Sequence, residues 1–320
     1  MADHIVRTFD TGYTPTSFKR DVDKMLALVA FEDTPFYTSM KKGKASTHGL
    51  VERLEDNLAS AAVNAQIEGA DVVTTAVDAP GTIDNRVQRF QKDIRISNDM
   101  EKTDKYARKS EINRIQNLKM KELARDMEYN MLNNTRATGT DAVAAKMDGL
   151  LQFAHADSTY DFGGTFADTN QIAEDILLDV LQAMWENGAK PDTILAPPTQ
   201  KRKISKFTDS GRVTVNQNAT EKQLTMIVNV LETDFGVVAV VPELFIEPEV
   251  DTTPDPDVLY DTLAIYDSRM IECKTFRPLE RKELAQTGDS RKFYMTTSKT
   301  ILPYSKKCVG KISKCTRVFA

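Results

Sequence analysis

The longest regular pattern of apolar and polar positions runs from residue 99 to residue 134, where the chain has no Gly and no Pro. Its apolar residues recur at intervals of three and four: Met120, Leu123, Met127 and Met131. That spacing places them on one face of a helix, while most of the remaining surface is charged. The pattern therefore predicts one long helix over 99–134 that packs against a sheet.

A second set of patterns, between 165 and 275, alternates helix with strand. Helical spacing over 170–187 follows a suitable N-cap, Thr169, and ends at Gly188. The next predicted elements are a strand, a short basic helix and three more strands, at 193–196, 199–207, 224–231, 237–241 and 259–266. We therefore expect residues 165–275 to form one α/β lobe.

The remaining stretches predict extended structure. Residues 1–45 are typical of an arm with one short helix near 18–30. Strand patterns at 48–58 and 86–97 flank nearly thirty residues with few large apolar side chains, which predicts an exposed two-stranded loop. Residues 269–319 have mainly strand patterns, with a polar turn at 287–290. In the stretch 247–257 acids alternate with prolines, so we expect a mobile acidic loop there.

Composition adds that the chain is an ordinary folded protein, with 41% hydrophobic and 28% charged residues. No apolar run is long enough for a membrane span or a signal peptide, so we expect a soluble protein made in the cytosol, with no membrane partner. The three cysteines, Cys273, Cys308 and Cys315, are too few for a disulfide framework, which fits a reducing compartment.

The residues that usually carry catalysis do not cluster in the sequence. His4, His48 and His155 stand alone, without metal-ligand spacing, so we expect no metal and no cofactor. Two Asp-Phe-Gly triplets, at 161–163 and 234–236, lack the other motifs of a protein kinase and are interpreted as turns. No catalytic residue is therefore assigned.

Charge is segregated along the chain. The stretch 223–268 has ten acids and no Lys or Arg, and the stretch after Asp289 has eight bases and no acid. A monomer gains nothing obvious from this asymmetry, whereas copies that pack head to tail can use complementary patches. The candidate contact residues between subunits are Lys306, Lys307, Lys311, Asp255 and Asp257. The alternatives are chance clustering on solvated faces and nucleic-acid binding by the basic tail, which the negative net charge of -5 disfavours.

Short segments in a fixed order across residues 34–290 carry a family resemblance. They are TPFY at 34–37, NAQIEGAD at 64–71, the strand 85–97, YAR at 106–108, ELARDME at 122–128, MDGL at 147–150, MWENG at 184–188 with PD at 191–192, DFG at 234–236 and LAQTGDS at 284–290. In this order they resemble the major capsid proteins of tailed phages with the Hong Kong 97-type fold.

The resemblance implies an α+β fold with four parts. These are an N-terminal arm at 1–45, an extended loop at 46–98, a peripheral domain at 99–164 and 276–320 with the spine helix 99–134, and an axial α/β domain at 165–275. It implies no enzymatic activity. It does imply a head protein of a tailed bacteriophage that self-assembles into the pentamers and hexamers of an icosahedral shell around double-stranded DNA.

The expected partners are copies of the same chain, a portal, the packaged DNA and a scaffolding protein. The scaffolding protein is expected to be a separate one, since no long helical leader precedes the arm. The protein is expected in the virion, assembled in the host cytoplasm. One relative of this fold forms lysine–asparagine cross-links, for which Lys44 or Lys92 would be the candidates. The alternatives are a non-capsid α/β enzyme with a lid-like insertion, and a scaffold or tail component of a phage particle.

Overall fold

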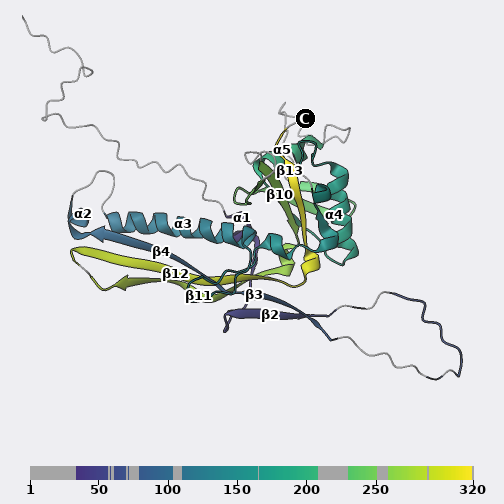
Figure 1. Ribbon diagram of the computed structural model, residues 1–320, viewed down its shortest axis with the longest axis horizontal. Helices are drawn as coiled ribbons and strands as arrows, with labels where there is room; N and C mark the ends of the chain where they lie inside the picture. The colour runs from purple at the N-terminus through teal and green to yellow at the C-terminus, as the bar shows by residue number, and fades with distance from the viewer. Residues whose placement is uncertain are drawn as a thin grey trace, which may run out of the picture.

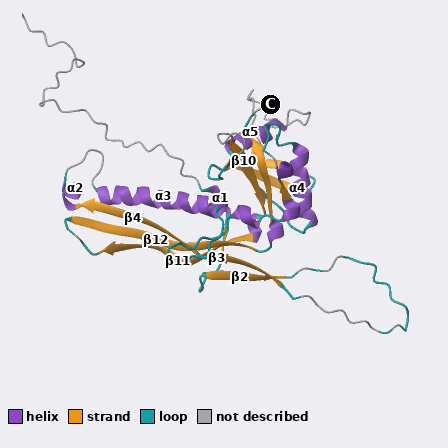
Figure 2. Cartoon of the chain, in the orientation of Figure 1, coloured by secondary structure: helices purple, strands orange, loops and turns teal. Residues whose placement is uncertain are grey.

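The chain forms two β-sheets and a projecting two-stranded ribbon (Figures 1 and 2). The computed structural model describes residues 34–56, 58, 61–69, 71, 79–103, 110–164, 166–207, 230–250, 259–286 and 288–318. Figure 2 shows a long helix lying along one sheet, a second lobe in which helices cover another sheet, and the ribbon extending away from both. The predicted helix at 18–30 lies outside the described residues, as do most of the predicted strand at 224–231 and most of the acidic loop.

The first sheet has four strands in the order β1, β11, β12 and β4 (Lys41–Lys42, Ile271–Leu284, Ser290–Pro303 and Gln88–Ser97). Buried and exposed positions alternate along β4, so that Phe90, Ile94 and Ile96 share one face. The long helix α3 (Glu111–Asn133) packs on this sheet and buries Leu123 and Met127. The predicted pattern of a long amphipathic helix on a sheet is thus confirmed.

The helix does not begin where the sequence predicts. A short helix, α2 (Asn98–Lys102), ends at Thr103, whose backbone is extended. Ser110 is the N-cap of α3, and its hydroxyl accepts a hydrogen bond from the amide of Asn113. The Glu101 carboxylate accepts further bonds from the amides of Glu111 and Ile112, at 3.0 and 3.2 Å. The prediction of one continuous helix over 99–134 is therefore wrong at its start, because side chains cap a new helix at Ser110 even though no Gly or Pro breaks the sequence.

The second sheet has the strand order β5, β13, β10, β6, β8 and β7, with β9 paired to β10. These strands are Thr159–Tyr160, Val309–Thr316, Leu259–Tyr266, Thr193–Ala196, Gly236–Pro242, Val230–Thr233 and Glu249–Val250. Two helices belong to the same lobe, α4 (Glu174–Glu186) and α5 (Pro198–Ser205). The predicted strands at 193–196, 237–241 and 259–266 are confirmed. Helix α4 begins after Ala173 instead of Thr169, and Gly188, with φ of 88°, follows its C-terminal end.

The sheets divide the chain differently from the predicted domains. Strand β13 lies between β5 and β10 in the second sheet, although the sequence places 276–320 in the other domain. Close packing fixes β13 there: a Cβ on Gly310 would lie 2.8 Å from Sδ of Met184 in α4. Conversely, β11 starts at Ile271, inside the predicted lobe 165–275, and belongs to the first sheet.

The projecting ribbon pairs β2 (Leu50–Glu55) with β3 (Gly81–Arg86), in the register Leu50 to Arg86 and Glu55 to Gly81. The sequence predicts instead that 48–58 pairs with 86–97. That prediction is wrong about the second strand, because β4 takes up residues 88–97 and pairs with β12 over its whole length. No helix in the described part of the chain is long and apolar enough to span a membrane.

Candidate assembly surfaces

The ribbon exposes apolar side chains, both on β2 and in the segment that follows it. Leu54 is 69% exposed, Val63 96% and Ile67 83%. In Figure 1 the described residues 61–69, between β2 and β3, lie far from the two sheets. Apolar surface of this kind on a two-stranded ribbon is typical of a contact site for another chain.

The base of the ribbon is fixed to the first sheet by a polar cluster. Arg53 of β2 forms an ion pair with Glu272 of β11 at 2.8 Å, and its guanidinium lies 3.6 Å from the ring centre of Tyr304. The Tyr304 hydroxyl donates to the same carboxylate at 2.6 Å. Burial acts to raise the pKa of Glu272, but the hydrogen bonds from Tyr304 and Arg53 outweigh it and hold the pKa below its usual value.

A second set of contacts fixes β3. Asp84 accepts two hydrogen bonds from the Arg136 guanidinium, at 2.9 and 2.7 Å. This pairing lowers the pKa of Asp84, so the stabilisation is present at neutral pH and is lost only as the pH falls below the ordinary Asp range. The buried Asn85 amide donates to the carbonyls of Asp148 and Ile301, at 3.0 and 2.7 Å. The ribbon is therefore firmly attached at its base while its far end is exposed.

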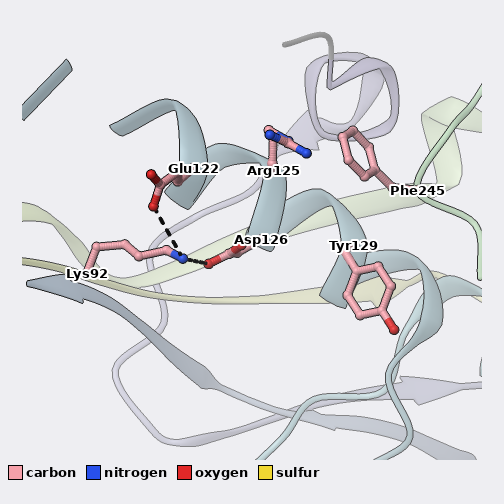
Figure 3. A pocket seen from close by; sticks show the side chains of 6 residues that line it. All are labelled: Lys92, Glu122, Arg125, Asp126, Tyr129 and Phe245. Atoms are coloured by element: carbon pink, nitrogen blue, oxygen red, sulfur yellow. Dashed lines mark ion pairs between the residues drawn. The ribbon is translucent and has the colours of Figure 1, made fainter. Parts of the chain in front are cut away.

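An open groove of 310 Å³ lies between α3, β4 and the segment after β8 (Figure 3). Lys92 forms an ion pair with Asp126 at 2.6 Å and reaches Glu122 at 3.8 Å. Arg125 lies over the ring of Phe245, 5.6 Å from its centre. Lys92, Glu122 and Asp126 thus pair with one another, which is typical of a solvated helix face.

The first described helix, α1 (Pro35–Ser39), is held by a buried carboxyl group. Glu128 of α3 accepts from the amides of Phe36 and Tyr37, at 2.7 and 2.9 Å. Phe36 is fully buried and packs edge to face against Tyr266, with ring centres 5.4 Å apart. Sequence analysis missed Glu128, although its place among the apolar positions of the helix is a signal that it is buried.

The structure places three of the predicted contact residues in two locations. Lys306 and Lys307 lie in a 3₁₀ turn between β12 and β13, where Lys306 is exposed. Lys311 lies on β13, opposite Ala264 and Thr159, and is half-buried. Asp255 and Asp257 lie outside the described residues. The three lysines therefore lie in the turn before β13 and on β13 itself, and their contacts with another copy stay a prediction.

The two oppositely charged stretches meet partly within one chain. Strand β10, from the acidic stretch, pairs with β13, from the basic stretch. Arg317 forms an ion pair with the buried Asp261 at 2.7 Å. The acidic and basic stretches therefore also contact each other within one subunit, and their proposed contacts between copies stay a prediction.

The described residues include no group of three His, Cys, Asp or Glu that could hold a metal ion. His4 lies outside the described part, and His155 accepts a hydrogen bond from the Asp157 amide at 3.3 Å. All three cysteines are buried, and burial raises the pKa of Cys308 to about 11 and that of Cys315 to about 12. These thiols therefore stay protonated and unreactive at neutral pH.

Solved structures with a similar fold cover nearly the whole chain. The capsid of a native GTA particle has a TM-score of 0.66 at 12% identity and covers 98% of this chain and 100% of that chain. The capsid of the cyanophage P-SCSP1u has a TM-score of 0.61 at 10% identity, with 94% and 98% covered. The holo-SrpI encapsulin complex from Synechococcus elongatus has a TM-score of 0.60 at 9% identity, with 94% of each chain covered. These similarities confirm the predicted Hong Kong 97-type fold.

A comparison with curated proteins finds no match. The family model of the SU10 major capsid protein, in contrast, matches residues 5–316, which is almost the entire sequence. The match extends over both sheets, the long helix and the ribbon. The chain therefore belongs to the SU10 major capsid protein family.

Proposed function

We propose that this chain forms the pentamers and hexamers of an icosahedral shell that encloses the double-stranded DNA of a tailed bacteriophage. As a member of a major capsid protein family, the chain is a structural component of a virion and assembles with its own copies into a multimeric shell. The observation that supports the proposed arrangement is the ribbon, whose exposed apolar side chains need a surface on another copy.

The finer assignments extend this proposal. The four-stranded sheet with α3 forms the peripheral domain, and the second sheet with α4 and α5 forms the axial domain. The arm ends before β1, and the extended loop is the ribbon of β2 and β3 with the segment between them, without β4. A scaffolding protein and a portal take part in assembly, which takes place in the host cytoplasm. The chain acts without a cofactor, and a role as an α/β enzyme is not favoured, because the groove in Figure 3 presents paired charges.

The test is assembly of the purified full-length chain, observed by electron cryomicroscopy and sedimentation. We expect closed shells with fivefold and sixfold capsomers. Replacing Leu54 and Ile67 by Asp should prevent shell formation and leave the subunit folded, because it places charge on the apolar surface that contacts a neighbour. The control is Met100→Asp, at a residue that is 48% exposed outside the ribbon. A compact monomer in every condition, or normal shells from the ribbon variant, would contradict the proposal.

The charged residues receive a separate test. If Lys306, Lys307 and Lys311 contact acidic residues such as Asp255 and Asp257 of a neighbour, then changing the three lysines to Glu should hinder assembly. Added salt should also weaken assembly of the unaltered chain in part, because a Debye length of about 8 Å near physiological ionic strength screens exposed charges. Sedimentation across a salt series measures both effects. Normal assembly of the triple variant at low salt would remove these residues from the interface.

A further inference from the structure

Two carboxyl groups are buried together beneath α1. Glu128, on α3, and Glu243, immediately after β8, both have no exposed surface. They lie close enough for the charge of Glu243 to raise the pKa of Glu128. Two ionised carboxylates are both acceptors and cannot bond to each other, whereas a proton on one of them turns repulsion into a hydrogen bond.

The other partners of the pair are neutral backbone amides. Glu128 accepts from Phe36 and Tyr37 of α1, and Glu243 Oε1 accepts from the amide of Phe245 at 2.9 Å. Oε2 of Glu243 is buried and has no donor among the described residues. A proton held between the two carboxyl groups supplies the hydrogen-bond donor that this oxygen lacks. Without a donor, an unsatisfied buried acceptor costs about 1–3 kcal/mol.

The elements packed around the pair bring no ion-pair partner among the described residues. From β10, Tyr266 presents a hydroxyl that hydrogen-bonds Ser39 at 2.8 Å, and burial raises its pKa far above the usual value. From β12, Lys299 bonds to the Tyr37 hydroxyl, and on α3 Arg125 lies over the Phe245 ring. Neither cation forms an ion pair with Glu128 or Glu243 in the structure. Two negative charges here would therefore repel each other, with only the backbone amides of Phe36, Tyr37 and Phe245 to stabilise them.

We infer that Glu128 and Glu243 share one proton at neutral pH, and that its loss in mildly alkaline solution releases α1 from the body of the subunit. The five residues of α1 are the weaker cover over the pair. The segment after β8 is held by the hydrogen bond from the Glu243 amide to the Ala196 carbonyl at 2.9 Å. The Asn133 side chain holds it further, since it donates to the Phe245 carbonyl and accepts from the Glu247 amide.

The direction of the pH dependence follows from the charges. Burial is the main cause that raises the pKa of Glu128 to about 8, and the charge of Glu243 adds to it; burial likewise raises the pKa of Glu243. The docked state thus binds more protons than the released state. Docking is strongest below the ordinary Glu pKa of 4.5 and is lost as the pH rises through about 8. With that pKa, docking weakens about tenfold between pH 7 and pH 9.

The test is hydrogen exchange at the amides of Phe36 and Tyr37 in the full-length chain, with rates divided by the intrinsic rate at each pH. We expect protection to fall about tenfold from pH 7 to pH 9. In Glu243→Gln the fall should shrink, because the neutral amide removes the charge of Glu243 while burial still raises the pKa of Glu128. The matched control is Glu122→Gln, a half-exposed position on the same helix, which should keep the fall.

A measurement on the unaltered chain keeps the inference falsifiable if the variant does not fold. The ¹³C signals of the Glu side-chain carboxyls should include one that titrates near pH 8. Absence of any such signal above pH 6, a flat exchange profile in the unaltered chain, or a loss confined to residues 243–247 would each overturn the inference. The readout follows the single subunit, so it is independent of whether shells form and hence of the proposed function.

Discussion

Replacing Arg53 by Ala should loosen the base of the ribbon more than any other single ion-pair change there. The Arg53 and Glu272 side chains are only 18% and 10% exposed, so water shields their 2.8 Å contact poorly. A hydrogen bond between charged groups in such a setting contributes about 2 kcal/mol. The stacking of the guanidinium over Tyr304, at 3.6 Å, adds about 1 kcal/mol. The expected total loss is therefore about 3 kcal/mol.

The assay is hydrogen exchange of the β2 and β3 amides, combined with a double-mutant cycle that uses Glu272→Gln. A coupling of about 2 kcal/mol corresponds to a change of roughly thirtyfold in the opening equilibrium of the ribbon. The Asp84–Arg136 pair is the matched comparison: its side chains are 33% and 32% exposed, so we expect a coupling of only about 1 kcal/mol. Amides of β10 should not change. A coupling below about 0.5 kcal/mol for Arg53 and Glu272 would refute the reasoning.

Three further changes test other parts of the fold by urea unfolding. Gly149→Ala should destabilise the subunit by about 2 kcal/mol or more, because the added Cβ would lie 2.5 Å from the carbonyl oxygen of Leu132, a backbone atom that cannot move aside easily; an unchanged midpoint would contradict this. Glu101→Ala should cost about 1 kcal/mol and speed exchange in the first turn of α3, since it removes the acceptor for two helix amides. Arg317→Ala should cost about 2 kcal/mol by leaving the buried Asp261 without its ion pair, whereas a loss within experimental error would show that water replaces the arginine.

Sequence patterns predicted the elements whose reasons are local. Strand β10 is an apolar run, and α4 ends where Gly188 adopts a positive φ, so both follow from neighbouring residues. The family fold was predicted as well, from the order of short segments. The start of α3 was not, because it depends on Glu101 accepting hydrogen bonds from helix amides ten and eleven residues along the chain.

Local sequence patterns could not predict which distant segments pair with one another. Strand β3 has mostly polar residues and buries only Ile83 and Asn85, so its alternation is weak and the sequence predicts 86–97 as the partner of 48–58. The contact between Glu128 and Glu243 joins residues more than a hundred positions apart. Each is an ordinary Glu in the sequence, and only the fold reveals that they must share a proton.

The position of β13 in the middle of its sheet has a consequence for synthesis on the ribosome. Residues 309–316 emerge after every other strand, yet they join β5 to β10 and pack against α4. Until the ribosome has released these residues, the edge of β10 stays unpaired and the apolar face of α4 stays partly uncovered. Such a state is prone to aggregation and is recognised by chaperones. Folding of this lobe is thus tied to the synthesis of residues 309–316, and a subunit terminated before them cannot present a finished lobe to a growing shell.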